Sequence, residues 1–157
     1  MTPPKSLPTR QIGKLGELLV QYKLLQYGIE SAPLTTDAGI DLVAYGPNSK
    51  KAITIQVKTN LKPKPGGGKG RPYVNWWVED DNPAKIFALV DISTEKIWIL
   101  TKREFENKAQ QHSSGRLQLY MALTPKSLLR GKIGRSSQVL KYKRYLFENR
   151  IYLFLGK

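Results

Sequence analysis

The sequence has no cysteine, a single histidine and no long apolar run. Without cysteine the chain can form no disulfide and offers no thiolate to a metal, and one histidine, His112, excludes a histidine-rich metal cluster. The run IYLFLG at residues 151–156 is far shorter than the roughly 20 apolar residues of a membrane-spanning helix. The opening MTPPKSLPTR lacks the apolar centre of a signal peptide. These absences predict a soluble, intracellular (cytoplasmic) protein.

Acidic residues are also scarce, since 12 Asp or Glu stand against 26 Lys or Arg and give a formal net charge of +14. Such a positive field attracts polyanions, with nucleic acid as the leading partner and anionic membrane as the competitor. Basic residues gather in 60–72, which contains no acid, and in 125–157, where nine Lys or Arg face only Glu148. Residues 73–124 between them are nearly balanced in charge.

The chain of 157 residues has the length of one domain, which we expect to span residues 1–157. Residues 1–10 are rich in proline and predict a flexible arm. A helix is expected over 11–27, ended by Gly28, because apolar residues recur there at helical spacing: Leu15, Leu18, Leu19, Tyr22 and Leu25. Gly13 and Gly16 each cost that helix about 1 kcal/mol relative to alanine, which indicates close approach of another backbone or of a ligand.

The middle of the chain predicts strands and turns. Six strands are expected. They lie at 30–34, at 40–45 and 52–58 (joined by the turn GPNSK), at 73–78, and at 87–92 and 96–100, which form a second hairpin. Residues 61–72, LKPKPGGGKGRP, have the composition of an irregular loop.

Two further helices are expected toward the end of the chain. Thr101 and Glu104 in TKRE match a capping box that opens a helix to about Gln111. Residues 136–147, within the basic extension 125–157, resemble a basic helix. The order of elements predicts an α/β (α+β) fold, with a central mixed β-sheet flanked by helices.

Charged and polar side chains stand at the ends of two predicted strands that are otherwise apolar. In a strand, Gln56 and Lys58 project to one side while Val57 points to the other, and the hairpin can bring Asp41 close to them. Glu17 on the first helix can add a carboxylate. Oxygen ligands of this kind suit a hard cation such as Mg²⁺, which can lower the pKa of a bound water for hydrolysis of a phosphodiester.

Three segments carry a family resemblance: GKLGELLVQYKLLQYGI (13–29), GIDLVAY (39–45) and ITIQVKT (53–59). Together they resemble the PD-(D/E)xK nuclease superfamily with its restriction-endonuclease-like core. The likeness covers roughly the first 60 residues well and the later hairpin and helix loosely. Among short members the chain is similar to archaeal Holliday junction resolvases and to intron-encoded homing endonucleases.

The resemblance implies a Mg²⁺-dependent nuclease, with Mn²⁺ as a substitute. It implies that Asp41 binds the metal, that Lys58 is the catalytic lysine and that Glu17 is the helix carboxylate of several branches. Gln56 stands where the family usually has Asp or Glu, although homing endonucleases of the family look similar to this chain in carrying glutamine there. Ile40 replaces the proline of the motif. The Val57 carbonyl is a further ligand in this reading.

Several candidate site residues have an alternative interpretation. Asp37 is an alternative carboxylate, although its context TTDAG is typical of a turn. The loop cations Lys62, Lys64, Lys69 and Arg71 adjoin the predicted site, so we expect phosphate contacts, while a solvated charge run is the alternative. Three cations near the end of the chain form either a second phosphate-binding face or a solvated one, and the sequence favours neither: Lys141, Lys143 and Arg144.

Aromatic residues and the lone histidine carry less information. Trp76 and Trp77 are adjacent in a predicted strand and must face opposite sides, so one of them belongs to the core. The other, with Tyr73, could stack on bases. His112 has no partner pattern and is left out of catalysis.

The sequence therefore predicts a Mg²⁺-dependent DNA endonuclease. Since cutting both strands takes two sites, we expect a homodimer or a higher homo-oligomer. One alternative is a DNA-binding protein with the nuclease fold that has lost effective metal binding through Gln56. A second is a basic protein that binds anionic lipid or RNA without chemistry.

Overall fold

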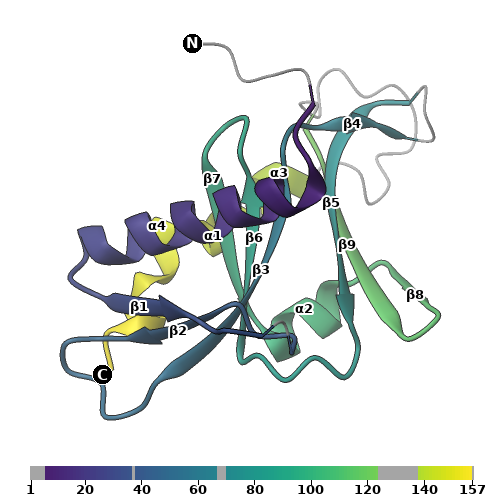
Figure 1. The fold of residues 1–157 in the computed structure, drawn as a ribbon. Coiled ribbons are helices and arrows are strands. Elements are labelled where there is room, and N and C mark those ends of the chain that lie inside the picture. Colours follow the sequence, from purple (N-terminus) through teal and green to yellow (C-terminus); the bar gives the residue numbers. More distant parts are fainter. Residues whose placement is uncertain (1–5, 37, 67–69, 124–137, 157) are drawn as a thin grey trace.

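The computed structural model describes residues 6–36, 38–66, 70–123 and 138–156 (Figure 1). The helices are α1 (Thr9–Gln26), α2 (Lys102–Lys108), α3 (Gln138–Lys141) and α4 (Phe147–Arg150), with 3-10 helices η3 (Lys143–Tyr145) and η4 (Ile151–Phe154). The strands are β1 (Glu30–Pro33), β2 (Leu42–Tyr45), β3 (Ile53–Asn60), β4 (Lys64–Pro65), β5 (Pro72–Glu79), β6 (Ile86–Asp91), β7 (Lys96–Thr101), β8 (Gln111–Ser113) and β9 (Arg116–Ala122).

The first sheet has five strands in the order β1-β2-β3-β6-β7. Both predicted hairpins are confirmed, because β2 pairs antiparallel with β3 and β6 pairs antiparallel with β7. The central pair, β3 and β6, runs parallel and makes the sheet mixed. The predicted fold class, a central mixed sheet flanked by helices, is confirmed.

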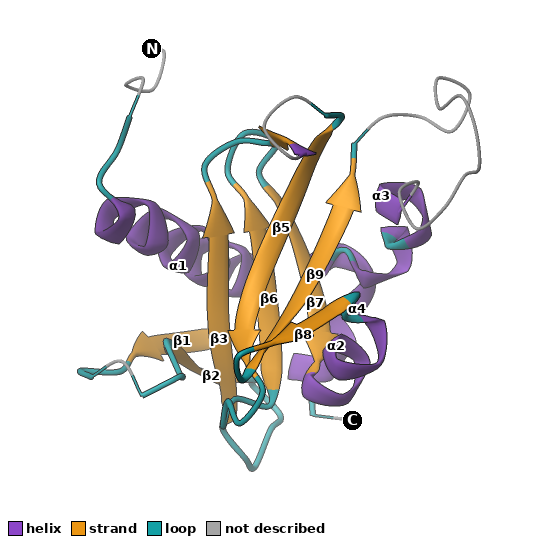
Figure 2. Ribbon diagram, turned by 90° about the vertical axis from the view of Figure 1, so that its right-hand side faces the viewer, coloured by secondary structure: helices purple, strands orange, loops and turns teal. Residues whose placement is uncertain are grey.

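The second sheet has four antiparallel strands in the order β4-β5-β9-β8. In Figure 2, β5 and β9 lie in front of the first sheet. Strand β4 lies inside the segment 61–72, where we expected only irregular loop, and Lys64 pairs there with Tyr73. The expectation overlooked a pairing that depends on the partner strand rather than on local composition.

The two faces of the first sheet are buried by different layers. One face packs against α1 and the C-terminal helices, where Val20 and Leu24 meet Ile55, Val57 and Phe147. The other face packs against the second sheet and α2, in a cluster that contains Val74, Trp76, Phe87, Trp98 and Phe105. Trp76 is thus the core tryptophan that the alternation predicted, with Trp77 half-buried on the other side of β5.

Helix α1 buries a narrower stripe than its leucine content indicates. It begins at Thr9, so the last two residues of the predicted arm are helical. Its buried residues are Gly16, Val20 and Leu24. The apolar side chains Leu15, Leu18, Tyr22 and Leu25 are between 38% and 58% exposed. A side chain at Gly16 would overlap the Thr59 side chain of β3, so this glycine lets the helix approach the sheet closely. The same expectation is wrong for Gly13, where a side chain would meet nothing within 4 Å among the described residues.

Helix α2 confirms the predicted capping box and is shorter than expected. The Thr101 hydroxyl accepts from the Glu104 amide at 3.2 Å, and the Glu104 carboxylate accepts from the Thr101 amide at 2.8 Å. The helix ends at Lys108 rather than near Gln111, because residues 111–113 pair with β9 as strand β8.

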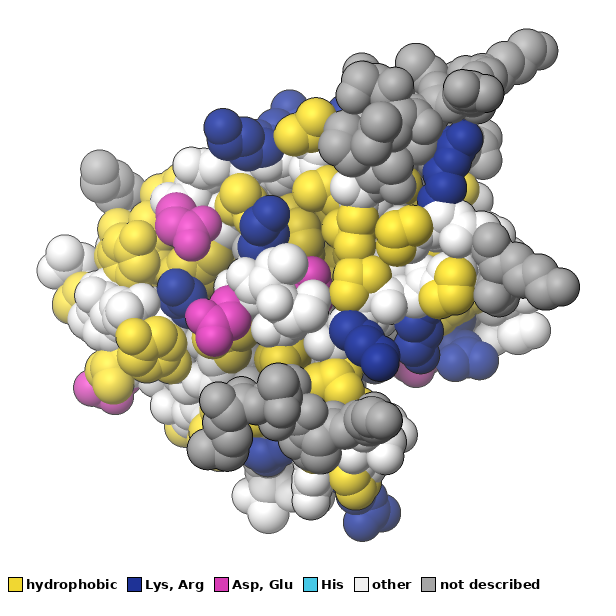
Figure 3. Space-filling view, turned by 90° about the horizontal axis from the view of Figure 1, so that it is seen from above, with side chains coloured by type: hydrophobic (Ala, Val, Ile, Leu, Met, Phe, Trp, Pro, Cys, Tyr) yellow, Lys and Arg dark blue, Asp and Glu magenta, His cyan; other side chains and the backbone are white. Residues whose placement is uncertain are grey.

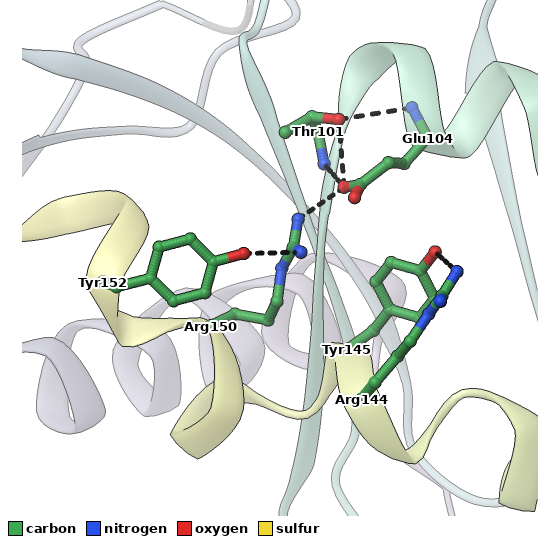
Figure 4. Close-up of polar contacts among 6 residues, drawn as sticks. All are labelled: Thr101, Glu104, Arg144, Tyr145, Arg150 and Tyr152. Carbon is green, nitrogen blue, oxygen red and sulfur yellow. Dashed lines mark hydrogen bonds and ion pairs between the residues drawn. The ribbon is translucent and has the colours of Figure 1, made fainter.

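The C-terminal segment is a series of short helices and not the single basic helix predicted for 136–147. Its anchor is Arg150, whose guanidinium donates to the Glu104 carboxylate at 2.5 Å and to the Tyr152 hydroxyl at 2.9 Å (Figure 4). Burial raises the pKa of Glu104, but the Thr101 hydrogen bonds and the Arg150 charge outweigh it and leave that pKa below 4.5. Among the helices of the described residues, none combines the length and apolar character needed to cross a membrane.

Candidate active site

Asp41 and Gln56 lie side by side at the start of strand β2. The Asp41 amide donates to the Ile55 carbonyl at 2.9 Å, which extends the β2–β3 ladder by one residue. The Asp41 carboxylate accepts hydrogen bonds from the Gln56 side-chain amide and, at 2.6 Å, from the Val57 backbone amide. The hairpin thus brings the two predicted site residues into contact.

A chain of hydrogen bonds sets the orientation of Gln56. The Ala84 amide, which can only donate, donates to Asn82 Oδ1 at 2.9 Å, so Asn82 Nδ2 is turned to Gln56 Oε1 at 3.0 Å. Gln56 Nε2 therefore faces the acceptor Asp41. Both residues are buried, since Gln56 is 4% exposed and Asn82 is 2% exposed. In this arrangement Gln56 directs a donor toward the aspartate.

Lys58 lies on the same face of β3 as Gln56, as the strand period predicts. Its Nζ is 3.7 Å from Glu79 Oε2 at the end of β5. A pocket of about 410 Å³ lies beside them, lined by Ala38, Gly39, Gln56, Lys58, Glu79, Asp81, Asn82 and Pro83. Both the ammonium and the amide therefore border one polar cavity.

Gly39 shapes one wall of this pocket. Its φ of +81° lies in the left-handed region that favours glycine. A side chain there would meet Asn82 and Pro83 at 2.9 Å. The glycine before Asp41 thus lets the loop from 38 to 41 pass against the residues that hold Gln56.

Glu17 is positioned on the other side of the first sheet. It lies on α1, which packs against the Ile55 and Val57 face, and its carboxylate pairs with Lys14. It does not line the pocket that Gln56 and Lys58 border. Asp41 contacts Gln56, and Gln56 borders the pocket with Lys58. Neither Asp41 nor Glu17 is among the residues that line the pocket, and the role of Glu17 in the site stays a prediction.

The oxygen donors near Asp41 suit Mg²⁺ in type. Asp41 supplies a carboxylate and Val57 a backbone carbonyl, while Mg²⁺ keeps several waters and needs only one or two carboxylates. Gln56 can add its oxygen only by turning its amide away from Asn82. Across the described residues, no three His, Cys, Asp or Glu side chains group as a metal site.

The predicted phosphate-binding cations fall in three places. Lys62 and Lys64 border a pocket of about 310 Å³ between the start of α1 and the end of β3. Arg71 borders another, of about 470 Å³, on the second sheet. Lys69 and the alternative carboxylate Asp37 lie outside the described residues.

The tail cations are exposed and sit on the C-terminal segment. Lys141 ends α3, Lys143 begins η3, and the Arg144 guanidinium lies over the Tyr145 ring at 4.8 Å and donates to its hydroxyl at 2.7 Å. Seen from above, Lys and Arg side chains are scattered among hydrophobic ones and acidic side chains are sparse on the described surface (Figure 3). Phosphate binding by these residues stays a prediction.

Sequence reasoning missed Glu79, Asp81 and Asn82, which line the pocket with Gln56 and Lys58. They belong to the segment EDDNP after a predicted strand, a cluster of acids within an otherwise basic chain. That cluster was the available signal. Their contact with β3 depends on how the second sheet packs, which no local pattern reveals.

No protein-family model matches the sequence, and no curated protein is found to match it. Among solved structures, a bacterial homing endonuclease, I-Ssp6803I, is similar with a TM-score of 0.61. The chain has a homing-endonuclease-like fold. The likeness covers 96% of this chain and 93% of that chain, at 15% sequence identity. A likeness at this identity speaks for the fold and leaves the chemistry to the residues of the site.

Proposed function

We propose that the protein is a metal-dependent DNA endonuclease of the PD-(D/E)xK type, with its site at Asp41, Gln56 and Lys58. The observation that carries the proposal is the placement of a carboxylate, an amide and an ammonium on one face of one hairpin, beside a polar pocket. The homing-endonuclease-like fold supports it. The three residues hold the order and spacing of the superfamily motif, with Gln56 in the acidic position.

Asp41 and the Val57 carbonyl would hold Mg²⁺ or Mn²⁺, with Gln56 and Glu17 as the further predicted ligands. When bound, such an ion polarises a phosphate oxygen and lowers the pKa of a coordinated water. Lys58 orients the attacking water and offsets negative charge that builds up on the phosphate. Water adds to phosphorus, one P–O ester bond breaks, and the departing oxygen takes a proton.

Glu79 supports the role of Lys58. It lies within 3.7 Å of the ammonium and, being half-exposed, leaves Lys58 able to turn toward a phosphate. A surface ion pair of this kind is worth at most about 1 kcal/mol, so exchange of Glu79 for a phosphate costs little.

DNA is the proposed partner because the chain carries +14 and one basic segment, 60–72, follows Lys58 directly in the sequence. Cleavage of both strands takes two sites, so we also propose a homodimer or a higher homo-oligomer. The exposed apolar stripe of α1, made of Leu15, Leu18, Tyr22 and Leu25, offers a second copy a surface on which to pack.

A catalytically weak, DNA-binding protein is the second candidate function. One observation favours it: Gln56 carries no charge and presents its nitrogen, not its oxygen, to Asp41. In that case the pocket would hold a cation too weakly for turnover, while the basic surface would still bind DNA.

The deciding experiment incubates purified protein with plasmid, branched and single-stranded DNA, in Mg²⁺, Mn²⁺ or EDTA. We expect cleavage that needs the divalent ion and is lost in Asp41→Ala. Binding without cleavage in any buffer would favour the second candidate. If Asp41→Ala and EDTA leave the cleavage unchanged, the proposed site is wrong. If no DNA is cleaved, and RNA or anionic lipid is bound equally well by Asp41→Ala and in EDTA, a basic binding protein without chemistry becomes the better account.

A further inference from the structure

The second sheet has an outer face that the first sheet does not cover. Directly paired residues of β5 and β9 share a face, and the pairs Val74–Met121 and Trp76–Leu119 point into the core. The alternate pairs point outward: Tyr73–Ala122, Asn75–Tyr120, Trp77–Gln118 and Glu79–Arg116. This outer face is in view in Figure 2, with β8 beside β9. It is rich in amides and aromatic rings.

Gln118 is the most informative residue of this outer face. It is only 7% exposed, yet its side chain makes no hydrogen bond to any described residue, and it borders the pocket of about 470 Å³. The nearby Gln110 differs, because its side chain both donates to and accepts from the Tyr120 backbone, at 2.8 and 3.0 Å. The Gln118 amide atoms are reached by solvent from the pocket, so water pairs with them until a ligand takes its place.

Gln111 joins Gln118 at the same pocket. The two residues are paired across β8 and β9, so their side chains lie on the same face. Gln111 is exposed, and its side chain also lacks a hydrogen bond within the described part of the chain. Two neighbouring amides are therefore available, with Tyr73, Tyr120 and Arg71 around them.

The charge of the outer face favours a polyanion. Segments 70–78, 110–113 and 116–122 contain no acidic residue. Arg71 stands at one end, and at the other the Arg116 guanidinium lies 5.8 Å from the centre of the Trp77 ring. Acids begin only at Glu79, beside Lys58, and at Asp80, which pairs with His112.

We propose that this outer face reads base edges of duplex DNA, with Gln118 and Gln111 as the specificity-determining residues. A glutamine amide pairs bidentately with the adenine edge in the major groove, which admits a two-stranded β-ribbon, and Gln111 and Gln118 face each other across the edge hairpin β8–β9. Arg71 and Arg116 contact phosphates on either side. The inference rests on the proposed endonuclease function and names how its substrate is selected.

Two observations favour a duplex over a single strand, and over RNA. The Tyr73 and Tyr120 rings pack edge to face, at 61° and 6.0 Å between centres, so they offer unpaired bases no flat platform. The deep, narrow major groove of double-stranded RNA does not admit side chains. Strand β5 also connects the outer face to the candidate active site, since it ends at Glu79 beside Lys58.

The test is selection from a library of random duplex DNA by the full-length protein, followed by sequencing of the bound fraction. We compare wild type with Gln118→Leu, which preserves volume, and with Gln111→Ala, an exposed change that leaves folding intact. Gln11→Leu, an exposed glutamine on α1, is the matched control. Binding to one non-specific duplex is measured over a range of salt.

We expect wild type and Gln11→Leu to select the same sequence with adenine at the amide-read positions. Each test variant should lose about tenfold discrimination at one or two of these positions, with unchanged non-specific affinity and salt dependence. Single-stranded DNA should compete more weakly than duplex of equal length. These outcomes together support the proposal.

The failures are distinguishable. If wild type cleaves DNA with a sequence preference that both glutamine variants retain, the proposal that the outer face reads bases is wrong and the endonuclease proposal stands. A wild-type protein that binds duplex DNA without sequence preference also overturns the proposal that the outer face reads bases. A wild-type protein that neither binds nor cleaves DNA overturns both proposals at once.

Discussion

Strand β3 turns Ile55 and Val57 toward α1, and it turns Gln56 and Lys58 toward the second sheet. On the first face Ile55 and Val57 are buried in an apolar cluster. On the second, the amide and the ammonium border a polar pocket together with acids from the segment after β5. Because successive residues face opposite ways, one strand separates the side chains that hold the fold from those that border the candidate site.

This comparison teaches that the strand can be anchored rigidly without any contribution from the site. The apolar face is closed by α1 and by the C-terminal helices, which Arg150 ties to Glu104. The polar face keeps half-exposed groups such as Lys58 and Glu79. The largest loss of stability is therefore expected on the apolar face, whereas substitution of the partly exposed Lys58 should reduce activity with little loss of stability.

Ile55→Ala should give the largest loss of stability. Ile55 is fully buried, so removal of its side chain leaves a cavity and should cost about 2–5 kcal/mol in the free energy of unfolding. Urea unfolding measures it. Ile53→Ala, on the same strand but half-buried, is the control and should cost less. Equal costs for the two would contradict the packing described for this face.

Asn82→Ala tests the support of the polar face. It leaves the Ala84 amide and Gln56 Oε1 without their partner in a buried setting, so we expect a loss of about 1–3 kcal/mol in the free energy of unfolding. Asn149→Ala, which removes one exposed hydrogen bond to the Lys143 carbonyl, is the comparison and should cost clearly less. An unaltered midpoint in urea for Asn82→Ala would sink the orienting role of Asn82.

Gln56→Glu adds a negative charge to the polar face of strand β3 and leaves its apolar face unchanged. A second carboxylate beside Asp41 replaces a hydrogen bond by repulsion, so in EDTA the variant should be about 1 kcal/mol less stable than wild type. Mg²⁺ should restore this loss and should raise the stability of the variant more than that of wild type. Thermal unfolding in both buffers gives the answer, and a response to Mg²⁺ no greater than that of wild type would refute a cation site here.

The smallest effect expected is the pH dependence of the C-terminal anchor. The pKa of Glu104 is lowered in the folded protein, so its contribution is complete above its ordinary value of 4.5 and is lost as the pH falls through the lowered value. Between neutral pH and about pH 3, wild type should lose up to about 1 kcal/mol more than Glu104→Gln. Urea unfolding at both pH values measures the difference. A larger loss in Glu104→Gln would reverse the assigned sign.

Local patterns predicted the hairpins and the capping box because their determinants are local. The GPNSK turn and the alternation in AITIQVK specify which residues of β3 share a face, so the proximity of Asp41, Gln56 and Lys58 followed. The capping box depends on two side chains three residues apart.

Long-range packing accounts for what the sequence did not reveal. Both sides of α1 carry leucine, so only the contact with Thr59 and Ile55 selects Val20 and Leu24 as its buried side. Strands β4 and β8 exist because β5 and β9 offer them edges. Asn82 is 26 residues from Gln56 along the chain, and nothing in its own neighbourhood signals the bond between them.

The most direct test of the central claim is the Mg²⁺-dependent cleavage rate of duplex DNA by Lys58→Ala. Lys50→Ala, an exposed lysine in the turn between β2 and β3, is the matched control. We predict that Lys50→Ala cleaves like wild type, and that Lys58→Ala loses at least about a hundredfold in rate while its unfolding midpoint stays unchanged. Cleavage by folded Lys58→Ala at the wild-type rate would contradict the account.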